Sequence, residues 1–350
     1  MDPRLNELKC WSAQMLAQSG IALSQNWQCA VVAGDASFRR YFRIQDGEHS
    51  WIAVDAPPEK EDSAPFVAVA RSWQQLEVNV PDILAADLQL GFMLLQDFGD
   101  EQYLTHLNQD SADRLYQPAF SELLKLQACT EVDGQALPPY DIAMLTREVE
   151  LFREWFLQKL LEYPLSEHHN RLLDELFAGL IGSALEQPQV CVHRDYHSRN
   201  LMLCDNGQVG VIDFQDAVHG PVTYDLVSLL RDCYIAWPQT RIDAWRDSFL
   251  LELQKSPTYA AVDNTQFARW FDLMGMQRHL KAIGIFARLK IRDGKNGYLP
   301  DIPRTMGYLI NVADQYPEFA DASAWLRQDI VPRMQQSGFF EADAMKRWLS

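Results

Sequence analysis

A short run of polar side chains between residues 193 and 213 has the types and spacing needed for chemistry on a charged substrate. Asp195 follows a histidine and an arginine, and Asn200 stands five residues further along. Asp213 comes after two short apolar stretches that we expect to form a strand hairpin. Each residue alone has an ordinary interpretation as a loop acid, a cap or a turn residue. Together they predict oxygen atoms converging around one hairpin.

Phosphoryl transfer is the chemistry that this arrangement favours. One carboxylate must face the acceptor hydroxyl, while other oxygens hold Mg²⁺ on the nucleotide phosphates. The run from His193-Arg194-Asp195 to Asn200 matches H-R-D-x-x-x-x-N, a catalytic-loop signature of kinases. We therefore predict Asp195 as the catalytic carboxylate, and Asn200 and Asp213 as ligands of Mg²⁺ bound with ATP. His193 is predicted to brace the loop, since Asp195 already fills the role of base.

The elements that must position these residues form two groups. The first hundred residues alternate short apolar runs with turns, which predicts a small antiparallel sheet with one helix. Later segments have helical periodicity, at 110–129, 141–161, 167–186 and beyond residue 224. Strand signals return only briefly, at 190–193, 201–203 and 209–212. We predict an α+β fold with an N-lobe of residues 1–98, a helical C-lobe of residues 99–350 and a cleft between them.

Composition argues against several classes of partner. The 350 residues include 31 Lys and Arg against 48 Asp and Glu, and the formal net charge of −17 repels nucleic acid. No apolar run approaches the roughly 20 residues of a membrane-spanning helix, and the polar N-terminus is unlike a signal peptide. Six scattered cysteines form no C-x-x-C pair, which predicts reduced, mostly buried thiols. We expect a cytoplasmic monomer that binds a small molecule and neither nucleic acid nor membrane.

The sequence resembles the aminoglycoside phosphotransferase superfamily of kinase-like enzymes, in particular its bacterial branch of N-acetylmuramate/N-acetylglucosamine kinases. Beyond the catalytic loop, three strings carry the resemblance, which covers nearly the whole chain: 34–43, 55–62 and 277–289. The resemblance implies a two-lobed, protein-kinase-like fold. It also implies ATP-dependent phosphorylation of the anomeric hydroxyl of a cell-wall amino sugar, as part of peptidoglycan recycling.

Further roles follow from the resemblance alone. It implies that a loop covers the nucleotide phosphates, formed by Gly34, Asp35, Ala36 and Ser37. It also implies that the segment 94–98, with Gln96 and Phe98, is an interlobe hinge that holds adenine through backbone groups. Asp225 would be a buried carboxylate at a helix start that braces the catalytic loop.

Two features depart from the kinase pattern. The third strand, 51–55, has no lysine to grip the ATP phosphates, and the phosphate loop has a single glycine. Arg40, Arg43 and Lys60 are possible substitutes; Arg43 is the one we include among the predicted nucleotide-binding residues. The missing lysine also motivates an alternative, in which the chain is a nucleotide-binding pseudokinase.

The acceptor is suggested by local charge. Between Gln277 and Lys295 six basic residues stand against one acid, Asp293. We interpret this run either as a solvated helix face or as a pocket for an acidic substrate, with Arg278 and Lys281 as candidate ligands. A kinase of a cationic small molecule, of the aminoglycoside or choline type, is the alternative that the overall charge suggests. A protein kinase is disfavoured because the segment after Asp213 is short and lacks A-P-E.

Overall fold

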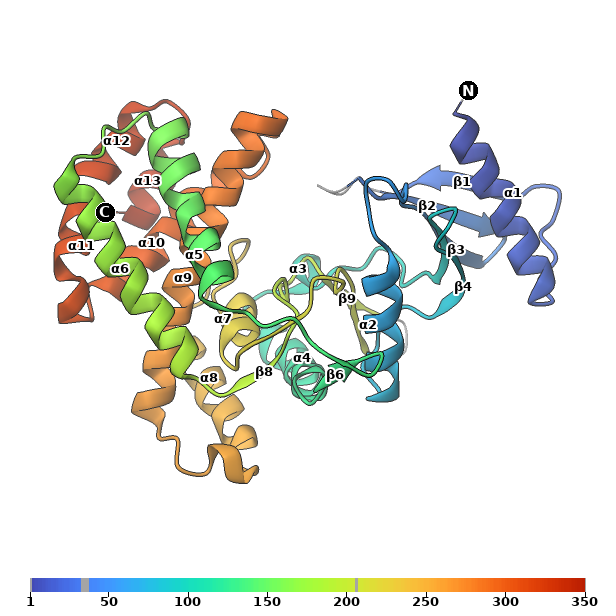
Figure 1. Cartoon of the computed structure of the whole chain (residues 1–350), viewed down its shortest axis with the longest axis horizontal. Helices are drawn as coiled ribbons and strands as arrows, with labels where there is room; N and C mark the ends of the chain where they lie inside the picture. Colours follow the sequence, from blue (N-terminus) through green and yellow to red (C-terminus); the bar gives the residue numbers. More distant parts are fainter. Residues whose placement is uncertain (1, 33–37, 205–206, 350) are drawn as a thin grey trace. The chain divides into compact units, whose positions relative to one another are not determined.

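The computed structural model describes residues 2–32, 38–204 and 207–349. The chain forms two compact units. The sheet unit comprises residues 1–137 and 199–217, and the helical unit comprises residues 138–198 and 218–350. Figure 1 colours the chain from blue at the N-terminus to red at the C-terminus. The segment 199–217 therefore packs with the sheet unit, although it lies between two parts of the helical unit in sequence.

A five-stranded antiparallel sheet forms the centre of the sheet unit. Its order is β1-β2-β3-β5-β4, with β1 (Gln28–Val31), β2 (Arg40–Asp46), β3 (His49–Asp55), β4 (Ile83–Asp87) and β5 (Phe92–Gln96). A tight turn joins β2 to β3, and its first residue, Gly47, has φ +63°, a value that favours glycine. Helix α1 (Pro3–Gln18) packs on the sheet (Figure 1). Leu8 and Leu16 of α1 share a core with the sheet residues Phe42, Ile44, Ala53, Phe92 and Leu94.

The other elements of the sheet unit support the hairpin that carries two predicted site residues. They are α2 (Ala64–Gln75), α3 (Tyr103–His106), α4 (Ala112–Gln127), β6 (Glu131–Val132), β7 (Gln135–Ala136), β9 (Leu201–Leu203) and β10 (Val209–Val211). β9 and β10 pair antiparallel. Phe66 and Trp73 of α2 contact the ring of Phe214, with centroid distances of 4.7 and 5.7 Å. The N–H of Val211 donates to the carbonyl of Asn79 at 2.8 Å. These contacts attach the β9–β10 hairpin to the sheet unit.

The helical unit is built around α9 (Asn264–Asp293), a 30-residue helix that ends at Gly294 with φ +68°. Its other longer elements are α5 (Ile142–Leu151), the π-helical η1 (Phe152–Leu160), α6 (Glu167–Glu186), β8 (Gln189–Val192), β11 (Val218–Pro221), α7 (Tyr224–Leu230), α8 (Gln239–Leu253), α10 (Ile302–Ala313) and α13 (Ala342–Leu349). Shorter helical segments are η2 (Pro257–Tyr259), η3 (Leu299–Asp301), η4 (Pro317–Phe319), α11 (Ala320–Trp325), the π-helical η5 (Leu326–Ile330) and α12 (Val331–Gln336). β8 and β11 pair antiparallel.

Helix α9 is surrounded by other helices. It packs against α5, η1, α6, α7 and α10 (Figure 1). Gly284 allows the close approach to α5, because a Cβ atom at this position would lie 2.4 Å from the backbone carbon of Leu151. The shared core includes Phe152, Leu173, Leu280 and Ile283. Because several faces of α9 are buried, polar residues on it need partners inside the unit.

The predicted α+β class is confirmed, with an antiparallel sheet lobe and a mainly helical lobe. Contacts divide the chain differently from the boundary expected near residue 98, because α4 and the β9–β10 hairpin pack with the sheet unit. The sequence did not predict the short strands β6, β7 and β11. All six cysteines are free thiols, and three of them are buried. Within the described ranges, no helix combines the length and apolar character needed to cross a membrane.

Candidate active site

The segment after β8 is held at its start by a buried aspartate. Asp225, in the first turn of α7, accepts hydrogen bonds from the backbone N–H groups of His193 at 2.7 Å and Arg194 at 3.0 Å. Arg194 has φ +79°, an unfavourable value for a residue other than glycine. The Nδ1 atom of His193 accepts a hydrogen bond from the N–H of Asp195 at 3.2 Å. Neighbours on both sides of the strained residue therefore fix the backbone that carries Asp195.

The far end of this loop is held by Asp232, a residue that sequence reasoning missed. Its Oδ2 accepts hydrogen bonds from the N–H and the Oγ of Ser198 at 3.0 and 2.5 Å. Its Oδ1 accepts one from the N–H of Tyr234 at 2.9 Å. Asp225 lies in the first turn of α7 and Asp232 lies two residues after its end, so this short helix and the residues after it brace both ends of the loop. The signal in the sequence was a second aspartate two helical turns after Asp225.

Replacing Asp232 with alanine is expected to lower the free energy of unfolding by about 3 kcal/mol. Each buried donor that is left without an acceptor costs about 1–3 kcal/mol. Urea unfolding measures the change, with Asp321→Ala, an exposed site on α11, expected to stay within about 0.5 kcal/mol of the wild type. Equal urea midpoints for Asp232→Ala and the wild type would show that this carboxylate does not brace the loop.

Asp195 is partly exposed and lies among positively charged groups of the helical unit. Burial alone would raise the pKa of Asp195. The charges of Lys281, His197, Arg278 and His193 outweigh burial and hold the pKa at about 2. The carboxylate is therefore ionised at neutral pH. Such an acid accepts a hydrogen bond readily but is a weak base, so it suits the orientation of a hydroxyl better than its complete deprotonation.

The two predicted acceptor ligands, Arg278 and Lys281, both lie buried on α9. The Nζ of Lys281 forms an ion pair with Glu148 at 3.2 Å and donates to the hydroxyl of Tyr224 at 2.9 Å. The Nη1 of Arg278 lies 3.7 Å from the Sγ of Cys233, and its Nε has no hydrogen-bond partner among the described residues. A buried guanidinium with so few partners is energetically unfavourable. Arg278 thus retains capacity to bind an anionic group.

The basic run between residues 277 and 295 therefore has a buried part and an exposed part. Arg278 and Lys281 are buried, which excludes a solvated helix face for these two residues. Arg292 and Lys295, at the end of α9 and beyond it, are exposed. The sequence pattern alone did not distinguish the two halves of the run.

In the sheet unit, the β9–β10 hairpin brings Asn200 and Asp213 together. The Nδ2 of Asn200 donates to the Oδ2 of Asp213 at 3.3 Å, and the N–H of Ile212 donates to the carbonyl of Asn200 at 3.1 Å. Gln215, which sequence reasoning missed, donates through Nε2 to the Oδ1 of Asp213 at 2.8 Å. Carboxylate and amide oxygens are the donors that Mg²⁺ prefers. The pair fits the predicted metal site in donor type and in mutual placement.

A cavity of about 460 Å³ in the sheet unit includes Ile212, the residue before Asp213, in its lining. Its apolar lining residues are Ala30, Val31, Val32, Met202 and Ile212. The rest of the lining is formed by Gln28, Arg43, Gln45, Gly99, Asp100 and Gln102. Small-molecule sites combine apolar walls with polar groups that fix the orientation of the ligand. The lining of this cavity has both kinds of residue, and such a combination suits a flat heteroaromatic base.

Only some of the described residues that were predicted to bind the nucleotide line this cavity. Arg43 lines this cavity, whereas Gln96 and Phe98 do not. The N–H of Gln96 donates to the carbonyl of Asp82 at 2.8 Å. The Phe98 ring packs against Gly210, where a Cβ atom would lie 2.6 Å from the ring. The predicted phosphate loop lies outside the described residues: Gly34, Asp35, Ala36 and Ser37.

Of the three possible substitutes for the missing lysine, Arg43 is the one that lines the cavity. It forms ion pairs with Asp97 at 2.5 Å and Asp100 at 2.7 Å, and the hydrogen bonds to these carboxylates raise its pKa. Arg40 instead pairs with Asp2 and with the buried Asp55. The Nζ of Lys60 lies 5.1 Å from the centre of the Phe38 ring.

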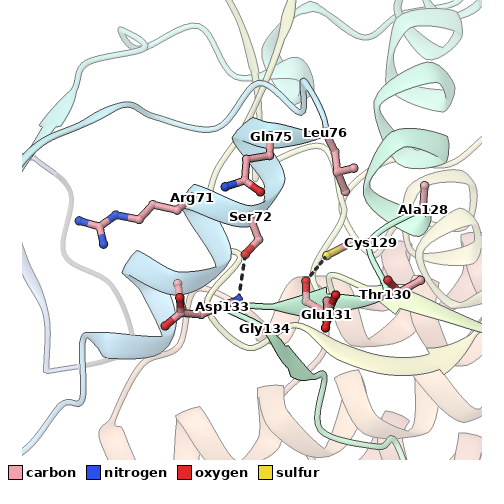
Figure 2. Close-up of a pocket in the computed structure, with 11 residues that line it drawn as sticks. Arg71, Ser72, Gln75, Leu76, Ala128, Cys129, Thr130, Glu131, Asp133 and Gly134 are labelled. Carbon is pink, nitrogen blue, oxygen red and sulfur yellow. Dashed lines mark hydrogen bonds between the residues drawn. The ribbon is translucent and has the colours of Figure 1, made fainter.

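Another cavity, of about 400 Å³, lies between α2 and the segment 128–134 of the sheet unit (Figure 2). The Oγ of Ser72 accepts a hydrogen bond from the N–H of Asp133 across it at 3.2 Å. None of the predicted site residues that the structure describes lines this cavity. We therefore assign it no part in the chemistry.

Residues 28–264 match the model of the phosphotransferase enzyme family, and the chain belongs to this family. Two curated relatives are N-acetylmuramate/N-acetylglucosamine kinases. The protein from Pseudomonas putida is 43% identical over 326 residues, covering 91% of this chain and 95% of its own. That from Neisseria meningitidis serogroup B is 41% identical over 331 residues, covering 90% and 94%.

Solved structures show the same fold at low sequence identity. An ethanolamine kinase from Plasmodium vivax has a TM-score of 0.58 at 10% identity, covering 86% of this chain and 83% of its own. The ternary complex of an aminoglycoside phosphotransferase, APH(2'')-IIa, with streptomycin and ATP has a TM-score of 0.55 at 13% identity, covering 90% and 95%. These likenesses identify the kinase-like fold.

Proposed function

We propose that this protein is a kinase that transfers phosphate from ATP to the anomeric hydroxyl of N-acetylmuramate or N-acetylglucosamine. The observation that carries the proposal is the 43% identity, over 91% of the chain, to a kinase named for both sugars. The products are the sugar 1-phosphate and ADP. The acceptor proton is released as the new bond forms.

Asp195 is proposed to orient the acceptor. In the reaction the anomeric oxygen forms a bond to the γ-phosphorus of ATP, and the bond from that phosphorus to the bridging oxygen breaks, so ADP leaves. The Asp195 carboxylate accepts a hydrogen bond from the anomeric hydroxyl and directs the oxygen lone pair toward phosphorus. Positioning of this kind is the main requirement of a loose phosphoryl transfer. A pKa of about 2 keeps the carboxylate in its accepting form.

Asn200 and Asp213 are proposed to hold Mg²⁺. When bound, Mg²⁺ neutralises charge on the nucleotide phosphates. The side-chain amide of Asn200 and the carboxylate of Asp213 lie next to each other at the ends of the β9–β10 hairpin. We further propose that the 460 Å³ cavity receives the adenine base and that Arg43 lies at its polar rim. The phosphate loop from Gly34 to Ser37 and the hinge role of Gln96 and Phe98 stay predictions from the resemblance.

Arg278 is proposed to bind the lactyl carboxylate that distinguishes N-acetylmuramate from N-acetylglucosamine. The guanidinium is buried, has few partners and contributes to the low pKa of Asp195, so the two groups lie within electrostatic reach. A cationic acceptor would meet the charges of Arg278 and Lys281 unfavourably. We do not extend this role to Lys281, because Glu148 and Tyr224 already bind its ammonium.

Replacing Arg278 with methionine is expected to raise KM for N-acetylmuramate by about 10- to 150-fold and to leave KM for N-acetylglucosamine nearly unchanged. A charge-assisted hydrogen bond contributes about 1.5–3 kcal/mol, which corresponds to that range. Initial rates with each sugar measure the effect, after a thermal melt shows that the variant is folded. Arg292→Met, at the exposed end of α9, is the control. Equal changes in KM for both sugars would contradict this role.

The class of acceptor is tested with a panel of compounds, each incubated with the enzyme, ATP and Mg²⁺. The formation of ADP from ATP is measured for each compound. We expect turnover of the two amino sugars and little with kanamycin, choline or ethanolamine. Rapid turnover of the cationic compounds without the sugars would assign the enzyme to the other acceptor class. Nucleotide binding without transfer to any compound would indicate a pseudokinase.

We also propose that the enzyme works in the cytoplasm as a monomer and takes part in peptidoglycan recycling. N-acetylmuramate is a sugar of that polymer, and the named relatives act on it. The six free cysteines favour a reducing compartment.

A further inference from the structure

Glu148 on α5 is a buried carboxylate that binds four side chains. Its Oε1 accepts from the Nη2 of Arg194 at 2.6 Å and pairs with the Nζ of Lys281 at 3.2 Å. Its Oε2 accepts from the hydroxyl of Tyr140 and from the Nε2 of Gln277 at 3.3 Å. These partners come from the catalytic loop, from α9 and from the chain before α5. Glu148 therefore links the catalytic loop to the central helix of the same unit.

The carboxylate of Glu148 stays charged in this environment. Burial alone would raise its pKa, but Lys281, Arg194 and the hydrogen bond from Tyr140 lower it below the usual value. A buried carboxylate is tolerated only with cations and hydrogen bonds of this kind. Removing its charge would leave the buried ammonium of Lys281 and the partly buried guanidinium of Arg194 without this counter-ion.

Both cations that Glu148 binds also affect Asp195. Arg194 is the residue before Asp195, and its backbone has φ +79°. Asp225 holds the backbone of Arg194, while Glu148 holds its guanidinium. Lys281 is the largest of the charge effects that lower the pKa of Asp195. The ammonium of Lys281 therefore interacts electrostatically with two carboxylates, Glu148 and Asp195.

We propose that Glu148 is a positioning residue for phosphoryl transfer. It anchors the strained backbone of Arg194 and retains Lys281, so that this ammonium does not form a direct ion pair with Asp195 and compete with the acceptor hydroxyl. This inference rests on the proposed role of Asp195. It assigns catalytic importance to a side chain that binds neither substrate.

Glu148→Gln tests this inference, because it keeps the shape of the side chain and removes its charge. We expect kcat to fall by about 10- to 100-fold, as for other small displacements of a reacting group, with KM for ATP within about twofold. The control is Glu150→Gln on the same helix, which loses an ion pair with Arg153 at 3.2 Å and is expected to keep the wild-type kcat. The assay uses whichever acceptor the wild type turns over best, so an error in the sugar assignment does not affect the comparison.

The double variant Glu148→Gln/Lys281→Met separates positioning from simple support of the fold. Removing the released ammonium is expected to restore kcat by about threefold or more relative to Glu148→Gln. Amide hydrogen exchange of residues 193–195 is expected to be faster in Glu148→Gln than in Glu150→Gln. A wild-type kcat in Glu148→Gln would overturn the proposal. So would unchanged amide hydrogen exchange in Glu148→Gln together with a double variant that is slower than Glu148→Gln.

Discussion

Asp195→Asn is expected to lower kcat by about 10²- to 10⁴-fold, the usual effect of losing one positioned acid–base group. The amide keeps the size of the side chain. It presents an N–H donor where the hydroxyl of the sugar needs a hydrogen-bond acceptor. ATP affinity is expected to change little, because the proposed role of Asp195 concerns the acceptor, whereas Arg43, Asn200 and Asp213 are the residues proposed for the nucleotide and the metal. Steady-state rates and nucleotide titration measure the two effects separately. A variant with near-wild-type kcat would contradict the role of Asp195.

The pH dependence of the wild type provides a second measurement of the same carboxylate. Because its pKa is lowered to about 2, Asp195 is ionised above about pH 4 and is protonated only as the pH falls toward 2. We therefore expect no acid limb of kcat/KM from this group between pH 5 and pH 8. An acid limb in that range that is absent from the residual activity of Asp195→Asn would show that the pKa is not lowered.

Asp213→Ala is expected to abolish the Mg²⁺ dependence of nucleotide binding. This carboxylate carries the formal charge of the proposed metal site, whereas Asn200 contributes a neutral oxygen, so its loss removes the main attraction for the ion. ATP is titrated against the variant with Mg²⁺ and again with a chelator. For the variant we expect weak ATP binding of similar affinity under both conditions. For the wild type we expect much tighter ATP binding with Mg²⁺ than with the chelator.

The exposed neighbour Asp216 offers a matched control for this experiment. Asp216→Ala removes a carboxylate three residues away and is expected to retain the full effect of Mg²⁺. If Asp213→Ala also retained it, the metal would have to be bound by other groups.

The catalytic loop and the hairpin after it were predictable from sequence because their function depends on residues close together in the chain. Asp195, Asn200 and Asp213 stand at fixed offsets, and a short hairpin is the simplest way to connect them. The structure brings Asn200 and Asp213 within hydrogen-bond distance, as that spacing indicated. The alternation of the first strands likewise indicated an antiparallel sheet.

The supporting residues could not be predicted because their partners are distant in sequence. Glu148 looks like one of several acids on a predicted helix, and only the packing of α5 against α9 brings it to Arg194 and Lys281. Asp232 is similar, since its partner Ser198 lies 34 residues earlier. Which residues of the basic run from Arg278 onward are buried could not be predicted either. Several faces of α9 are buried, so the helix lacks the one-sided apolar pattern from which burial is normally predicted.

The position of the transferred phosphate tests the proposed activity most directly. N-acetylmuramate and N-acetylglucosamine are incubated with ATP and Mg²⁺, and phosphorus–proton coupling in the NMR spectrum of each product locates the phosphate. We expect coupling to the anomeric proton, equal amounts of ADP and sugar phosphate, and no reaction with the methyl glycosides, which offer no anomeric hydroxyl. Phosphorylation of a methyl glycoside, or a phosphate on any other carbon of the free sugars, would contradict the proposed anomeric kinase.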